Sequence, residues 1–104
     1  MISVTVKRVE DKIVELTVRG HSGYADYGQD VVCAAVSAIT QTALLGLIHY
    51  AGNVRYERDE KKGYLHIVVP NEPETVCRGI VETAVIGLKD IAKGYGTFVR
   101  VEEK

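Results

Sequence analysis

Two residues of this sequence, His21 and Cys33, have the types and the spacing that nucleophilic catalysis requires. A cysteine thiolate attacks a carbonyl carbon, and a neighbouring imidazole accepts and returns the proton, so a Cys–His pair combines a nucleophile with a general base. The two residues lie at the ends of a glycine-rich stretch between a predicted strand and a predicted helix. Long connections of this kind often carry function. We therefore predict that Cys33 is a nucleophile and His21 its base.

The protonation of Cys33 decides whether this chemistry can run. A free cysteine with a pKa near 8.5 is only about 3% thiolate at pH 7. Lowering that pKa to about 6 would make it roughly 90% thiolate, a change of about 3.4 kcal/mol. A helix N-terminus contributes about 0.3–1 kcal/mol, which is too little. A second group is needed, and the nearest candidate in the sequence is His21.

The residues around Cys33 predict where its helix begins. Asp30 is a favourable N-cap residue, which makes Val31, Val32 and Cys33 the first three helical residues. Cys33 then lies at the positive end of the helix dipole. We expect the amides of this turn, that of Cys33 included, to form an oxyanion hole. Ser37 follows one turn later on the same face and would line the pocket.

Other residues of the stretch are assigned supporting roles. Asp26 or Asp30 would orient His21, and two tyrosines would contact substrate, Tyr24 and Tyr27. Structural explanations remain open: Cys33 as a small buried hydrophobe, His21 as a loop anchor, and Ser37 as a donor to its own helix. The remaining cysteine and histidines are predicted to be structural, namely Cys77, His49 and His66.

Composition limits the class of protein. The chain has 104 residues, which suits a single domain over residues 1–104. Thirteen Lys and Arg residues against fourteen Asp and Glu give a net charge of −1, so direct nucleic-acid binding is not expected. The sequence lacks Cys-x-x-Cys and paired-histidine spacings, and we expect neither a metal nor a cofactor. We also expect no membrane span, because polar residues interrupt the apolar runs. The alternating start indicates a strand rather than a signal peptide, and hence a cytoplasmic protein.

The elements that must position the pair follow from periodicity. Alternation predicts strands over 2–8, 12–19, 53–58, 64–69 and 97–102, and three-four spacing predicts helices over 31–51 and 73–93. Three sets of strand residues should face the core: Ile2, Val4 and Val6; Val14, Leu16 and Val18; and Val54, Tyr56, Leu65, Ile67 and Val69. The order ββαββαβ predicts an α+β two-layer sandwich, with a mostly antiparallel sheet and two helices on one face.

The helix over 31–51 carries no charged side chain at neutral pH except, partially, His49. A helix that is apolar all round must be covered on more than one side. We predict that a second copy of the chain covers part of it in a homodimer. The alternative is complete coverage within one chain.

One run of residues resembles a known signature. It comprises Gly20-His21, Tyr24-Ala25, Gly28 and the helix start Asp30-Val31-Val32-Cys33-Ala34-Ala35-Val36-Ser37. It is similar to the signature of the ribosomal-processing cysteine protease family, and the similarity extends over nearly the whole chain. In that family His21 would match the catalytic histidine and Cys33 the nucleophile. Gly20, Asp30 and Ser37 would match other motif positions.

The resemblance implies a function that composition cannot show. Members are small bacterial cytoplasmic proteases and homodimers, with a mobile loop over the active site. They remove a short N-terminal extension from a large-subunit ribosomal protein, cutting after an aromatic residue. Two other functions stay open. One is a ribosome-assembly module that binds the same protein without cutting it, and the other is a thiol redox sensor, in which Cys77 would have to resolve an oxidised Cys33.

Overall fold

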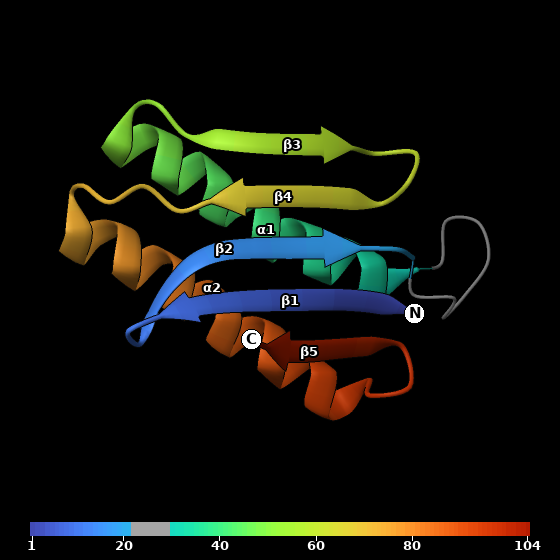
Figure 1. Cartoon of the computed structure of the whole chain (residues 1–104). Coiled ribbons are helices and arrows are strands. Elements are labelled where there is room, and N and C mark those ends of the chain that lie inside the picture. The colour runs from blue at the N-terminus through green and yellow to red at the C-terminus, as the bar shows by residue number, and fades with distance from the viewer. Residues whose placement is uncertain (22–29) are drawn as a thin grey trace.

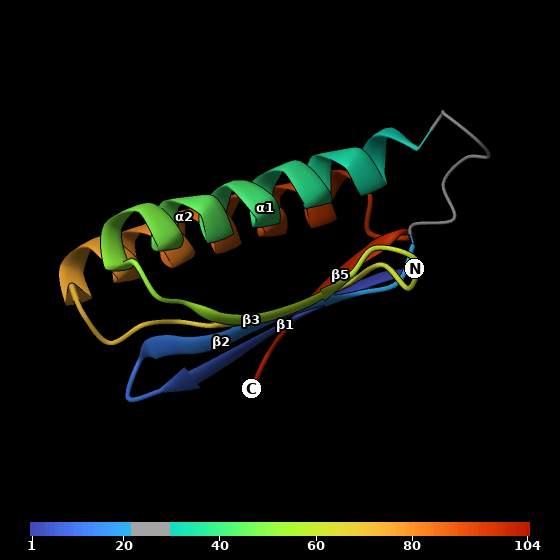
Figure 2. The ribbon, with the colours of Figure 1, turned by 90° about the horizontal axis from the view of Figure 1, so that it is seen from above.

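The computed structural model describes residues 1–21 and 30–104, and these residues form two layers (Figures 1 and 2). The elements in chain order are β1 (Ile2–Val9), β2 (Lys12–Arg19), α1 (Val31–Ala51), β3 (Arg55–Asp59), β4 (Tyr64–Val68), α2 (Glu74–Gly94) and β5 (Val99–Glu103). Figure 2 shows both helices on the same face of the sheet. The predicted α+β two-layer sandwich with ββαββαβ order is therefore confirmed.

The sheet has five strands in the order β3-β4-β2-β1-β5. Three of its four pairings are antiparallel, and β1 pairs with β5 in parallel. The two hairpins meet where β2 pairs with β4. As a result, the end of β2, the β3–β4 turn and the start of α1 lie at the same end of the molecule (Figure 1).

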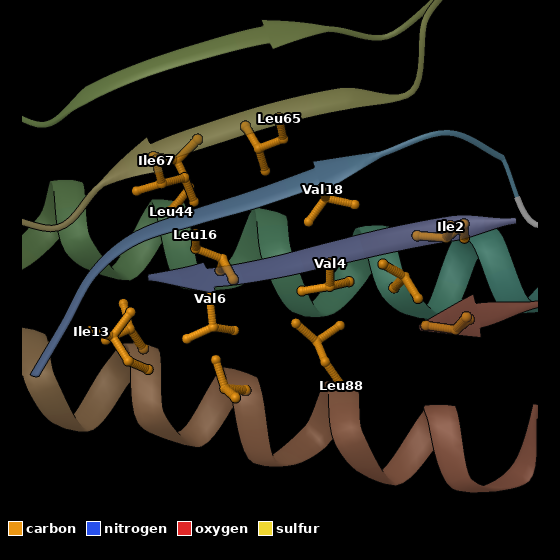
Figure 3. Packing of buried hydrophobic residues seen from close by; sticks show 14 of the residues in the cluster. Ile2, Val4, Val6, Ile13, Leu16, Val18, Leu44, Leu65, Ile67 and Leu88 are labelled. Atoms are coloured by element: carbon orange, nitrogen blue, oxygen red, sulfur yellow. The ribbon is translucent and has the colours of Figure 1, made fainter. Parts of the chain in front are cut away.

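The core lies between the sheet and the helices, as Figure 3 shows. The alternating residues of β1 point into it, with Ile2, Val4 and Val6 at most 1% exposed. Leu47 of α1 and Leu88 of α2 belong to the same core as these β1 side chains, and both are completely buried. Full burial of each such side chain contributes roughly 1.5–3 kcal/mol. This core fixes the strand ends around which the site is built.

The start of β2 departs from the predicted alternation. Val14 was expected in the core, but Ile13 is buried there instead, with 4% of its surface exposed. The reason is a register shift between Lys7 and Arg8, where a bulge in the β1–β2 pair changes which residue faces the helices. Leu16 and the residues after it follow the predicted pattern.

Tyr56 was also predicted to lie in the core, and this is wrong, because 44% of its surface is exposed. Its neighbour in the ladder, Ile67, is completely buried on the adjacent strand. Tyr56 lies on β3, the edge strand, so its side chain has a neighbouring strand on one side only. Val54 and Val69, predicted with it, do pack against the core.

Helix α1 is long and apolar enough to cross a membrane by length and composition alone, with a mean hydropathy of 2.0. The expectation that polar residues exclude such a run is therefore wrong. The interrupting residues are uncharged and lower the mean hydropathy too little; they are Ser37, Thr40, Gln41 and Thr42. In the structure one face of α1 packs on the sheet, through Val32, Val36 and other residues (Figure 2).

An ion-pair cluster centred on Arg8 joins β1 to both C-terminal elements. The Arg8 guanidinium makes two bonds to the Glu82 carboxylate on α2, at 2.7 and 3.0 Å. Oε1 of Glu103 on β5 lies 2.9 Å from the same guanidinium. Hydrogen bonding to Arg8 lowers the pKa of both carboxyl groups. The cluster therefore holds α2 and β5 against the first hairpin.

We expect this cluster to make stability depend on acid pH. Because the pKa values of Glu82 and Glu103 are lower in the folded than in the unfolded chain, the unfolded state binds more protons. The melting temperature should stay level above about pH 5 and fall as the pH drops below the unfolded value of about 4.3. In the variant Arg8→Leu the fall should be shallower. The control Arg100→Leu removes an exposed pair with Glu102 and should leave the slope unchanged. Equal slopes in all three proteins would contradict the prediction.

Candidate active site

A pocket of about 380 Å³ is lined by residues at the end of β2, in the first turns of α1 and around the β3–β4 turn. Both predicted reactive residues, His21 and Cys33, line it. Its other lining residues are Ile2, Val18, Gly20, Val36, Ser37, Thr40, Gln41, Arg58, Glu60, Gly63, Tyr64 and Leu65. The structure thus brings the predicted pair into one cavity, with apolar side chains from the sheet and helix beside it.

Cys33 is positioned by the start of α1, which begins at Val31 as predicted. Asp30 is the N-cap, and its Oδ1 accepts a hydrogen bond from the Cys33 amide at 2.8 Å. Cys33 is partly exposed, as a nucleophile must be to reach a substrate. Ser37, one turn later, lines the same pocket. The prediction of the cap and of the first helical residues is therefore confirmed.

The same hydrogen bond changes the expected oxyanion hole. The Cys33 amide was expected to contribute to it, but this N–H donates to the Asp30 carboxylate. It is not available for a substrate oxygen while Asp30 caps the helix. The two amides before it, those of Val31 and Val32, belong to the orphan donors that every helix start presents. An oxyanion hole at this helix start would therefore have to use these two amides rather than that of Cys33.

His21 is positioned by contacts to two separate segments, the N-terminus and the β3–β4 turn. Its carbonyl oxygen accepts a bond from the Met1 amino group at 2.6 Å. Its Nε2 lies 3.4 Å from the carbonyl oxygen of Lys61, in the β3–β4 turn. The predicted orienting residue Asp26 and the two tyrosines Tyr24 and Tyr27 lie outside the described residues.

Two glycines allow the backbone to pass closely beside His21. Gly20 has a φ of +90°, and a Cβ there would stand 2.6 Å from the carbonyl oxygen of Met1. Gly63 has a φ of +61°, and a Cβ there would stand 2.5 Å from the Gly20 oxygen and 3.1 Å from Cε1 of His21. The amide of Gly20 also donates to the oxygen of Gly63 at 2.9 Å. Side chains at either position would push these segments apart.

Sequence reasoning did not find the polar side of the pocket. Arg58 on β3 donates to Oε1 of Gln41 on α1 at 2.8 Å, which links the edge strand to the helix. Glu60 also lines the cavity. These residues are far from the motif in sequence. A glycine in the charged turn, Gly63, was the one visible signal that this turn had an unusual conformation.

The remaining cysteine lies far from the pocket. Cys77 is buried in the first turn of α2, and burial raises the pKa of its thiol. Because α1 and α2 run in opposite directions, their first turns lie at opposite ends of the molecule (Figures 1 and 2). A helix of 21 residues is roughly 30 Å long, whereas a disulfide needs Cα atoms within about 7 Å. An intramolecular Cys33–Cys77 disulfide is therefore excluded.

Two other histidines lie outside the pocket. His49 is in the last turn of α1, where a cation is favoured, and its ring contacts Tyr50 edge-on. Nε2 of His66 on β4 lies 2.7 Å from Oε1 of Glu15, and this bond lowers the pKa of Glu15. Within residues 1–21 and 30–104, His, Cys, Asp and Glu side chains form no group of three that could hold a metal ion.

Loss of the N-cap should measurably destabilise the helix that carries Cys33. We expect Asp30→Ala to reduce the free energy of unfolding by about 1 kcal/mol, because the Cys33 amide loses its acceptor. For a chain of this size that corresponds to a melting temperature about 4–8 °C lower. The control Asp30→Asn keeps a side-chain oxygen and should retain most of the stability. Calorimetry showing no difference between Asp30→Ala and the parent protein would contradict this assignment.

Comparison with known proteins identifies the family. The family model described as cysteine protease Prp matches residues 1–100. The chain belongs to the cysteine protease Prp family. It is accordingly a cysteine protease, as the resemblance of the Cys33 motif implied. The match spans both hairpins and both helices, so it covers every element that lines the pocket.

Relatives within the Prp family are similar over their whole length. The ribosomal processing cysteine protease Prp of Bacillus subtilis is 32% identical over 97% of this chain and 96% of the relative. That of Staphylococcus aureus is 27% identical over 99% and 97%. A crystal structure of the essential ribosomal processing protease Prp from S. aureus, in complex with a covalently linked product peptide, superposes with a TM-score of 0.93. It covers 100% of both chains at 24% identity, which establishes a common fold.

Proposed function

We propose that this protease removes a short N-terminal extension from a large-subunit ribosomal protein, cutting after an aromatic residue, with Cys33 as nucleophile and His21 as base. The observation that carries the proposal is that one pocket is lined by both residues, with Cys33 partly exposed in the first turn of α1. The names of the Prp relatives supply the substrate class. Apolar residues beside the pair, such as Val36 and Leu65, suit a hydrophobic peptide.

The reaction is acyl transfer to the thiol. His21 takes the proton of Cys33, and the sulfur attacks the scissile carbonyl carbon. First-turn amides of α1 hold the oxyanion. His21 then protonates the leaving amine, so the peptide bond breaks and an acyl-enzyme remains. Water, activated by His21, hydrolyses the thioester and restores the thiol.

Cleavage of a defined peptide tests this function directly. The substrate is a synthetic peptide that spans the N-terminal extension and the mature start of the large-subunit protein from the same genome. Mass spectrometry should show two products, cut after an aromatic residue. Pretreatment with iodoacetamide should abolish cleavage, because it blocks the partly exposed thiol. A non-catalytic assembly module would bind the peptide, leave it intact, and be indifferent to alkylation. That result would overturn the proposal.

We further propose that the protein is a homodimer. An open apolar groove of about 880 Å³ runs between α1 and α2 on the face away from the sheet, and small residues such as Gly46, Gly79 and Gly87 line it. Leu45 and Ile86, each one residue before a groove glycine, expose 66% and 68% of their surface. The described residues of one chain therefore leave this face uncovered, and a second copy would bury it.

Charge placed on this face should separate the dimer. We expect Ile86→Glu to shift the protein from dimer to monomer in sedimentation at micromolar concentration, because the new carboxylate would be buried without a partner. The control Val9→Glu adds the same charge at an exposed residue at the end of β1 and should leave the dimer intact. A monomeric parent protein, or an unchanged Ile86→Glu dimer, would contradict the proposal.

The remaining assignments follow from the substrate. We propose that residues 1–104 act as a single protease domain in the cytoplasm, where ribosomal proteins are made. The balance of thirteen basic and fourteen acidic residues favours recognition of the protein substrate rather than of RNA.

A further inference from the structure

We infer that the backbone carbonyl of Lys61, presented by the β3–β4 turn, orients His21 so that Nδ1 is the nitrogen that accepts the Cys33 proton. This inference rests on the proposed catalytic pair. It assigns to a peptide group the positioning role that a carboxylate or amide side chain has in other Cys–His and Ser–His enzymes. Lys61 is thus a positioning residue that acts through its main chain.

The tautomer follows from the chemistry of the contact. Nε2 of His21 lies 3.4 Å from the Lys61 oxygen, within hydrogen-bond geometry. A carbonyl oxygen accepts and cannot donate, so Nε2 must carry the proton in this contact. A neutral imidazole has one N–H, which leaves the lone pair on Nδ1. The bond is long for an N–H···O contact, and such catalytic bonds commonly tighten once substrate is bound.

The turn that presents this carbonyl is fixed on both sides of Lys61. Before it, Asp59 accepts a bond from the amide of Lys62 at 3.3 Å through Oδ1. After it, the amide of Gly63 donates to the Glu60 oxygen at 3.1 Å, and the Gly63 oxygen accepts from Gly20 at 2.9 Å. The residue before His21 is therefore tied to the same turn that contacts its ring.

The lack of a side chain at Gly63 is what allows this approach. A Cβ there would stand 3.1 Å from Cε1 of His21 and 2.5 Å from the oxygen of Gly20. Cε1 is the ring carbon between the two nitrogens, so a methyl group would press directly on the imidazole. The structure has no other acceptor assigned to the ring among the described residues. Displacing the turn would leave His21 free to adopt the unproductive tautomer.

Two alanine variants distinguish the effect of disturbing the His21–Lys61 contact from the effect of backbone strain at a glycine. Gly63→Ala and Gly52→Ala both place a methyl group on a residue with positive φ, +61° and +87°. At Gly52, the C-cap of α1, the methyl group meets nothing within 4 Å. We expect Gly63→Ala to lower kcat/KM by about 10–100-fold, mainly through kcat, as misorientation of a catalytic group does. Its pH–rate profile should also shift, because the ring loses its acceptor. Gly52→Ala should lose stability but keep both kinetic values.

Nitrogen NMR of the parent protein gives a readout that does not depend on these variants folding. In protein labelled with ¹⁵N-histidine, the His21 signals, assigned by their loss in His21→Gln, should show a protonated Nε2 and an unprotonated Nδ1 at neutral pH. A predominant Nδ1–H tautomer would overturn the inference. So would a folded Gly63→Ala variant with unchanged kcat/KM and pH profile. Failure of the catalytic pair itself would appear differently, as full activity in Cys33→Ala with the NMR result unaffected.

Discussion

Replacement of Cys33 by alanine should lower the rate of peptide cleavage by at least about 10³-fold, the loss typical when the nucleophile of a covalent mechanism is removed. The acyl-enzyme cannot form without the sulfur, and the N-cap bond from Asp30 to the residue-33 amide does not depend on the side chain. The variant should therefore remain folded. The measurement is kcat/KM on the extended peptide, together with a melting curve.

The second cysteine supplies a matched control for this experiment. Cys77→Ala removes the other thiol, which is 1% exposed in the first turn of α2 at the opposite end of the molecule. It should reduce stability, because a buried side chain is truncated, and leave kcat/KM unchanged. Cleavage by Cys33→Ala at the parent rate, or loss of cleavage in a folded Cys77→Ala variant, would refute the assignment of the nucleophile.

Replacement of His21 by alanine should lower kcat/KM by about 10²–10⁴-fold, the usual contribution of a general acid–base group. The ring both removes the thiol proton and protonates the leaving amine, so its loss affects both halves of the reaction. Alkylation of Cys33 by iodoacetamide should also slow near pH 6, because the thiolate loses its partner. Alkylation followed over pH 5–9 checks this second effect.

His66→Ala is the control for the loss of His21. This imidazole is bonded to Glu15, and it does not line the pocket. Its replacement should leave both the cleavage rate and the pH dependence of alkylation unchanged. If His21→Ala kept normal alkylation kinetics while losing cleavage, His21 would serve leaving-group protonation alone, and the thiol would need another activating group.

Much of the architecture could be predicted because the spacing of apolar residues along the sequence reflects which side chains are buried. The alternation of Ile2, Val4 and Val6 identified β1, and the cap at Asp30 located the start of α1 to the residue. The bulge beside Arg8 could not be predicted, since a register shift leaves the composition of the strands unchanged. The prediction that Tyr56 is buried failed for a related reason. Alternation indicates which face of a strand a residue lies on, but not whether the strand lies at the edge of the sheet.

The placement of the candidate residues in one pocket could be predicted for side chains and not for backbone groups. His21 and Cys33 could be paired because thiol and imidazole are distinctive and close in sequence. The carbonyl of Lys61 carries no such signature, since every residue has one. Its approach to His21 depends on β4 pairing with β2, which brings the second hairpin beside the first. Asp30 could be predicted as the N-cap, but only the structure shows that its side chain accepts from the amide of Cys33 rather than from that of Val32.

The pocket is assembled from residues as distant as Ile2 and Leu65, and one of its walls exists only once the second hairpin has joined the first. A growing polypeptide that has emerged only as far as α1 already contains both reactive groups but lacks this wall. The cavity that His21 and Cys33 line is therefore complete only after the later strands have been synthesised and have paired with the first hairpin.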